Sequence, residues 1–223
     1  MKKTFIKKLG NYDNPVFSRL AKVFELIILN FLWVAASLPI ITIGSATAAM
    51  YYTIAKHIRH ERGTLVKSFI ASFRENLLPG IALTTILAAI VAFLFVDYYC
   101  YPFLGEGSVS GSIYLLLLVA LATFVLLAVP YVFPVLSRFH VSVLGCIRYS
   151  LSFALRYLPW SLLMAAFMAG FVYSVLVIPH LLFVLPSLLG YVSSFFCERA
   201  FREQIAGDGG GEDGRDIPEW YEE

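Results

Sequence analysis

Long stretches of apolar residues, free of charge, alternate along the chain with short basic segments. Four of these stretches reach about 20 residues and predict membrane-spanning helices. A helix rises by about 1.5 Å per residue, so each stretch is long enough to cross a hydrocarbon core of ~30 Å. The predicted spans are residues 77–100, 112–133, 158–178 and 181–200.

The N-terminal third needs a different interpretation, because residues 26–55 contain no charge at all. A stretch of about 30 residues is too long for one crossing without a steep tilt. Pro39 and Gly44 lie in its middle, and proline removes a backbone donor that a helix needs. We therefore expect one helix over residues 20–38, a break, and a shorter helix over residues 45–56. A single tilted crossing is the alternative.

The short second helix is rich in glycine, alanine and serine. Gly44 and Ala48 are four residues apart, which is the spacing that lets two helix backbones approach closely in lipid. We expect this helix to pack inside the bundle.

The distribution of charge predicts the orientation of these helices. Basic residues gather in residues 1–22, 56–75 and 134–157, whereas the charges of residues 97–111 are both acidic. Cytoplasmic loops carry an excess of Lys and Arg, so the three basic segments and both termini are predicted to be cytoplasmic. The apolar stretch between the first two segments then crosses twice or enters and returns. A single crossing would instead place the basic N-terminus outside.

Two cytoplasmic connections are predicted to form amphipathic helices at the membrane surface. In residues 64–76 the apolar positions Leu65, Phe69 and Phe73 are spaced four apart, which places them on one helix face. Residues 138–157 have the same character. Their predicted apolar positions are Val141, Leu144, Leu151 and Leu155.

The composition supports lipid as the surrounding medium, since 59% of the 223 residues are hydrophobic and 14% are charged. A soluble domain is nearer half apolar and a quarter charged. We predict an all-α fold, a polytopic transmembrane bundle of about six membrane helices plus the two surface helices. The first two membrane helices form a hairpin or re-entrant pair. One transmembrane domain, residues 1–200, lies in the cell membrane, and residues 201–223 form a flexible acidic tail.

No arrangement of residues in the sequence predicts catalysis. His57, His60 and Glu61 share a helix face but lack the His-Glu-x-x-His order of a zinc site. The glycine-rich residues 207–214 carry acids where a phosphate-binding loop requires lysine. We expect no enzyme activity, no cofactor, no metal and no nucleic-acid partner.

Polar groups inside a membrane span are costly and tend to mark function. Glu25 and Asn30 lie in the first predicted membrane helix. Glu25 has a purely structural alternative, in which it pairs with Lys22 one turn away. Asn30 lies deeper and needs a partner on another helix. The predicted polar intramembrane site consists of Glu25, Asn30, Thr42, Thr47, Tyr51 and Tyr52. The candidate positions for docking a partner on the surface helices are Phe69, Phe73, Arg138, Arg148 and Arg156.

Several segments of the chain form a recognisable pattern, namely Asn14-Pro15, Leu29–Trp33, Leu38–Tyr52, Phe73–Asn76 and, more loosely, Phe133–Phe139. This pattern resembles the bacterial YesL family of multi-pass membrane proteins. The family has no established biochemical activity, and no ligand residues carry over. Its members are typically encoded beside sugar-uptake ABC transporters and polysaccharide-degrading enzymes, so the resemblance implies a role in carbohydrate import.

Three functions remain open from the sequence. The first is an accessory or regulatory component of a carbohydrate ABC importer, which docks on the permease or ATPase subunits and has no ATPase site of its own. The second is a small-solute permease that acts as a homo-oligomer, with solute passing beside the broken N-terminal helices. The third is a membrane sensor or scaffold whose tail recruits a partner.

Overall fold

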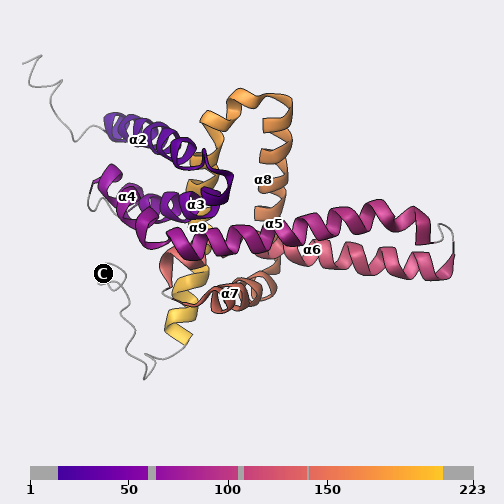
Figure 1. The fold of residues 1–223 in the computed structure, drawn as a ribbon. Coiled ribbons are helices and arrows are strands. Elements are labelled where there is room, and N and C mark those ends of the chain that lie inside the picture. Colours follow the sequence, from indigo (N-terminus) through magenta and orange to yellow (C-terminus); the bar gives the residue numbers. More distant parts are fainter. Residues whose placement is uncertain (1–14, 60–63, 105–107, 140, 208–223) are drawn as a thin grey trace, which may run out of the picture.

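The computed structural model describes residues 15–59, 64–104, 108–139 and 141–207 (Figure 1). Within these ranges the regular elements are all helices, which confirms the predicted all-α class. Two apolar clusters form the core. One lies around Tyr131, Phe153 and Phe201, and the other lies around Ile54 and Phe69. The His60–Glu61 pair and the glycine-rich tail beyond residue 207 lie outside the described residues.

The N-terminal apolar stretch is broken where the sequence predicts. Helix α2 (Pro15–Ala36) ends just before Pro39, a short 3-10 turn η1 (Ile40–Thr42) follows, and α3 (Ile43–Thr53) begins. The Thr42 hydroxyl lies 2.7 Å from the carbonyl oxygens of both Ala36 and Pro39. The side chain therefore satisfies backbone acceptors that the interrupted helix leaves open.

Helix α3 occupies the centre of the molecule. It contacts α2, α4 (Leu65–Glu75), α5 (Leu77–Cys100), α6 (Val109–Arg138) and α9 (Leu185–Gly207). Its close packing depends on two glycines. A Cβ atom added at Gly44 would lie 2.8 Å from the Gly80 carbonyl oxygen of α5, and one added at Gly80 would lie 2.8 Å from the Ser45 Cα. The prediction that this helix packs inside the bundle is confirmed. It continues into a π-helical stretch, η2 (Ile54–Arg59).

In the described part of the chain, three helices are long and apolar enough to cross a membrane, namely α5 (Leu77–Cys100), α6 (Val109–Arg138) and α8 (Leu158–Val177). Helices α5 and α6, joined through η3 (Tyr101–Leu104), form a long hairpin that projects away from the rest of the bundle (Figure 1). The prediction of about six membrane helices stays a prediction.

Helix α6 is longer than predicted, because it continues past residue 133 to Arg138. Two prolines lie inside it, Pro130 within the predicted span and Pro134 just beyond it. Prolines are tolerated in membrane helices where neighbouring groups satisfy the freed backbone. The inner half of α6, including Pro134 and Val135, is buried in the bundle. This packing holds the helix together across both prolines.

The two amphipathic helices are α4 (Leu65–Glu75) and α7 (Val143–Arg156). A single residue, Asn76 or Tyr157, separates each from the following span. Helix α4 packs Leu65 and Phe69 against the rest of the chain. On helix α7 two of the predicted apolar positions remain on the outside of the bundle, since Leu144 is 69% exposed and Leu155 is 48% exposed. Its buried residues are Cys146, Ser150, Phe153 and Ala154, which are smaller or aromatic and fit against α6.

The chain returns from α8 through η4 (Pro179–Phe183) to α9 (Leu185–Gly207). Helix α9 extends beyond residue 200, where the sequence predicts the start of the tail. The reason is Phe201, which is fully buried with its ring 5.3 Å from that of Phe139 and 5.1 Å from that of Phe153. Burial of this ring favours continuation of the helix into the predicted tail.

Candidate functional site

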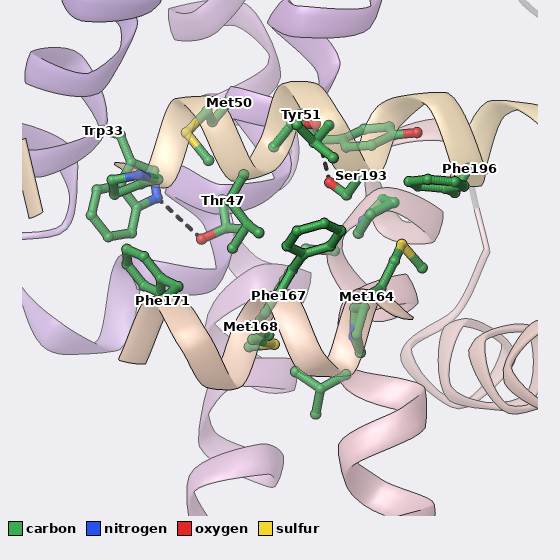
Figure 2. A pocket seen from close by; sticks show the side chains of 18 of the residues that line it. Trp33, Thr47, Met50, Tyr51, Met164, Phe167, Met168, Phe171, Ser193 and Phe196 are labelled. Atoms are coloured by element: carbon green, nitrogen blue, oxygen red, sulfur yellow. Dashed lines mark hydrogen bonds between the residues drawn. The ribbon is translucent and has the colours of Figure 1, made fainter. Parts of the chain in front are cut away.

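A cavity of about 280 Å³ lies between α3, α6, α8 and α9, and Trp33 of α2 lies at one end (Figure 2). The α8 wall consists of Met164, Phe167, Met168 and Phe171. These residues are spaced i, i+3, i+4 and i+7, so they form one stripe along the helix. Aromatic rings and flexible thioethers therefore dominate the lining.

The α9 wall is formed by Pro186, Leu189, Gly190, Ser193 and Phe196, together with Val192. Gly190 lets α9 approach α3, because a Cβ at this position would lie 2.9 Å from the Ile54 side chain and 3.4 Å from that of Met50. The Phe196 ring stacks on Trp160 at 4.9 Å between ring centroids. This stack joins α8 and α9 at the end of the cavity away from Trp33.

The polar side chains of the lining already have partners on the chain. The Trp33 indole N–H donates to the Thr47 hydroxyl at 3.1 Å, and this hydroxyl donates to the Ile43 carbonyl at 2.7 Å. The Ser193 hydroxyl donates to the Gly190 carbonyl at 3.0 Å (Figure 2). The Tyr51 hydroxyl donates to Glu198 at 3.2 Å. The cavity thus presents an apolar surface in which each of these donors is in use.

A buried ion pair lies directly beside the cavity. Glu198 of α9 accepts a hydrogen bond from Arg138 Nε at 3.0 Å and another from Arg138 Nη2. The two side chains are 1% and 3% exposed. Tyr51 connects this pair to the cavity, because its side chain lines the cavity and its hydroxyl donates to Glu198. Charges so far from water require a partner, so the pair holds α6 against α9.

The π-helical stretch after α3 makes a second connection to α9. Arg59 Nη1 donates to the Ser194 carbonyl at 2.7 Å, and the guanidinium lies 4.6 Å from the Phe195 ring centroid. Backbone carbonyls and aromatic faces are both favourable neighbours for a guanidinium. The inner ends of α3, α6 and α9 are therefore linked by two arginines.

The predicted polar site does not assemble as one cluster. Thr47 and Tyr51 line the cavity, Thr42 closes the helix break, and Tyr52 accepts a hydrogen bond from Lys56 at 3.0 Å. Glu25 lies 3.4 Å from His57. The residues of the predicted site therefore take part in several separate contacts.

Asn30 has its partners on another part of the bundle. Its side chain is fully buried, and its Oδ1 accepts from the Ser187 backbone N–H at 3.1 Å while its Nδ2 donates to the Leu182 carbonyl at 3.4 Å. Asn30 therefore bonds to the backbone of η4 and of the first turn of α9. The contact spans more than 150 positions of sequence, which local reasoning does not reach.

The five candidate docking residues fall into two groups. Phe69 and Arg138 are buried within the chain's own core, and the Phe73 ring is half-buried, with its centroid 6.2 Å from that of Phe69. These three side chains are covered by this chain. Arg148 and Arg156 are exposed on α7.

The sequence interpretation missed Glu198, Trp33 and the stripe of aromatic rings and thioethers on α8. A signal for Glu198 is present in the sequence, because it lies at helical spacing in a stripe with the uncharged residues Ser194, Cys197 and Phe201. A carboxylate within such a stripe indicates a buried ionic partner.

The sequence model of a family described as "Protein of unknown function, DUF624" matches residues 26–98. This match covers about a third of the chain and includes the helix break, α3, α4 and most of α5. No curated protein and no solved structure matches the chain.

Proposed function

We propose that the chain is an integral membrane protein of the YesL type and serves as an accessory or regulatory component of a carbohydrate ABC importer. YesL-type proteins belong to the family whose model matches residues 26–98, and three helices have the length and composition of membrane spans. Both termini, α4 and α7 lie on the cytoplasmic side in this proposal, and the α5–α6 turn lies outside. The chain carries no catalytic role and does not energise transport.

The proposal rests mainly on the face of α7 that points away from the bundle. Arg148 and Arg156 are exposed there beside Leu144 and Leu155, which are 69% and 48% exposed. This face combines apolar area with positive charge and is not covered by the rest of the described chain. Such a face fits a surface helix that contacts acidic or apolar groups of a permease or ATPase subunit at the membrane boundary.

A permease that passes sugar through the cavity is less well supported. A sugar presents many hydroxyl groups, and each one left without a hydrogen bond on burial costs free energy. The indole and hydroxyl donors of the lining are already in use within the chain. The same chemistry argues for a role in which this chain modulates an importer and does not itself conduct the solute.

Purification from native membranes in mild detergent tests the proposal. The Arg148→Glu and Arg156→Glu double variant reverses the charge of the α7 face, and we expect recovery of identified importer subunits to fall about tenfold. Lys67→Glu is the matched control, because Lys67 is an exposed cation on the other surface helix. Recovery of the wild-type chain without permease or ATPase subunits would contradict the proposal, as would equal losses for both variants.

A further inference from the structure

We propose that the cavity between α3, α6, α8 and α9 binds one hydrocarbon chain, supplied by a membrane phospholipid or by a free fatty acid. The lining is almost entirely aromatic rings, thioethers and aliphatic groups. Transfer of an apolar ligand out of water, or its contact with such a wall, lowers the free energy. The ligand also requires no hydrogen bonds. This inference goes beyond the proposed role in import and does not depend on it.

The hydrogen bonds of the lining exclude a strongly polar ligand. The indole N–H of Trp33 and the hydroxyls of Thr47, Tyr51 and Ser193 each donate within the chain. A polar ligand would have to break these bonds or remain unbonded itself, and both alternatives are unfavourable. A hydrocarbon leaves every one of them intact.

The size of the cavity fits part of an acyl chain. A cavity of ~150 Å³ with an apolar lining stays dry and binds benzene. The cavity here is about 280 Å³, so it has room for on the order of ten carbons. That is the scale of the inner portion of a common acyl chain.

The walls suit a flexible chain and lie beside the lipid. Met50, Met164 and Met168 line the cavity, and methionine adapts its shape to irregular ligands. Phe167 of the same lining is 46% exposed, so the α8 wall is also part of the outer surface. A chain can therefore enter sideways from the bilayer past this ring, and its contacts replace the dispersion contacts that an empty cavity would lack.

Photo-crosslinking to the full chain in lipid nanodiscs tests the proposal. One arm uses a phosphatidylcholine with a diazirine near the end of one acyl chain, and the other uses a fatty acid with the same group. The informative residue is Met50, which lines the cavity but is only 4% exposed, so lipid on the outer surface cannot label it. Leu83 is equally buried, lies outside the cavity and serves as the internal control.

We expect labelling at Met50 and none at Leu83. Labelling by both probes assigns the site to acyl chains of either source, and labelling by one probe alone identifies the source. Labelling by neither probe at Met50, with reaction only at exposed positions such as Leu116, would overturn the proposal.

A cavity-filling variant gives a second measurement. Met168→Trp places an indole in the cavity, and we expect Met50 labelling to fall about tenfold. Val172→Trp is the control, because Val172 lies one turn further along α8, is 50% exposed and does not line the cavity. If Met168→Trp fails to elute as a folded species, Ser193→Leu fills the same space from α9. Unchanged labelling in a folded cavity-filling variant would also overturn the proposal.

Discussion

The inner helix α3 and helix α5 of the projecting α5–α6 hairpin differ in how much of each helix is buried and in the size of their residues. Eight of the 11 residues of α3 are buried, and most of these are glycine, alanine, serine and threonine. Helix α5 buries two of its 24 residues, although it is built largely of leucine, isoleucine, valine and phenylalanine. Lipid is as apolar as leucine, so large apolar residues gain little from burial there.

What places α3 in the interior is close approach and hydrogen bonding. The Gly44 backbone N–H donates to the Thr84 hydroxyl at 3.1 Å, and the Ser45 hydroxyl donates to the Leu77 carbonyl at 3.0 Å. Both bonds join α3 to α5 at the point where Gly44 and Gly80 meet. Small and polar residues therefore mark this interior helix, and substitutions inside and outside the bundle test the difference.

The largest effect is expected from Glu198→Ala. The substitution leaves Arg138, whose side chain is 1% exposed, without its carboxylate, and such changes cost about 3–5 kcal/mol of unfolding free energy. Thermal unfolding in detergent, followed by circular dichroism, measures the loss. In the Glu25→Ala control the side chain removed is 33% exposed and pairs with His57, so we expect a loss below ~1 kcal/mol.

Replacing both charges separates the ionic interaction from packing. The double variant Arg138→Met and Glu198→Leu leaves no buried charge without a partner. It should therefore recover much of the stability lost in Glu198→Ala. Equal destabilisation by Glu198→Ala and Glu25→Ala would show that the Arg138–Glu198 pair contributes no more to stability than the Glu25–His57 pair.

A smaller effect is expected from Gly44→Ala. The added Cβ would lie 2.2 Å from Thr84 Oγ1 and 2.8 Å from the Gly80 carbonyl, and overpacking of this kind costs about 1–3 kcal/mol. The control is Gly170→Ala on α8, where nothing lies within 4 Å of the added atom. That control should be neutral or stabilising by about 0.5–1 kcal/mol, because alanine favours the helix. A reversal of this order would refute the close α3–α5 contact.

The mildest test leaves the sequence unchanged and uses its three cysteines. Cys100 is exposed at the end of α5, whereas Cys146 and Cys197 are buried. Burial also raises the pKa of the Cys146 thiol to about 12, so the reactive thiolate stays scarce there at pH values well below that. We expect a maleimide to modify Cys100 in the folded protein and all three thiols after denaturation.

The same reaction on intact cells tests the orientation. A maleimide that does not cross the membrane should reach Cys100, because the α5–α6 turn is proposed to lie outside. In the purified folded protein, raising the pH from about 7 to about 9 should not increase the modification of Cys146, since its thiol remains protonated over that range. Modification of Cys100 only after permeabilisation would place this turn in the cytoplasm.

Features with a local chemical cause were predictable from the sequence. The break around Pro39 follows from the missing backbone donor of proline, and the bounds of α5 follow from an uninterrupted apolar run. The central position of α3 follows from its small residues. In each case the relevant interaction depends on residues that are close together in the chain or on the solvent.

Features that depend on distant partners were not predictable. Helix α6 continues through Pro134 because the bundle packs around it, and α9 continues past residue 200 because Phe201 packs on Phe139 and Phe153. The Arg138–Glu198 pair joins residues 60 positions apart. The sequence interpretation instead placed Arg138 at a docking surface, because the carboxylate that binds it lies on α9, three helices further along the chain.

The one-residue links at Asn76 and Tyr157 fix the rotational phase of each span relative to its surface helix. One extra residue after Tyr157 would turn α8 by about 100° about its axis. The stripe of Met164, Phe167, Met168 and Phe171 would then face away from α9. A change in the length of this link therefore rotates the α8 wall of the cavity, because a link of one residue is too short to compensate for the rotation.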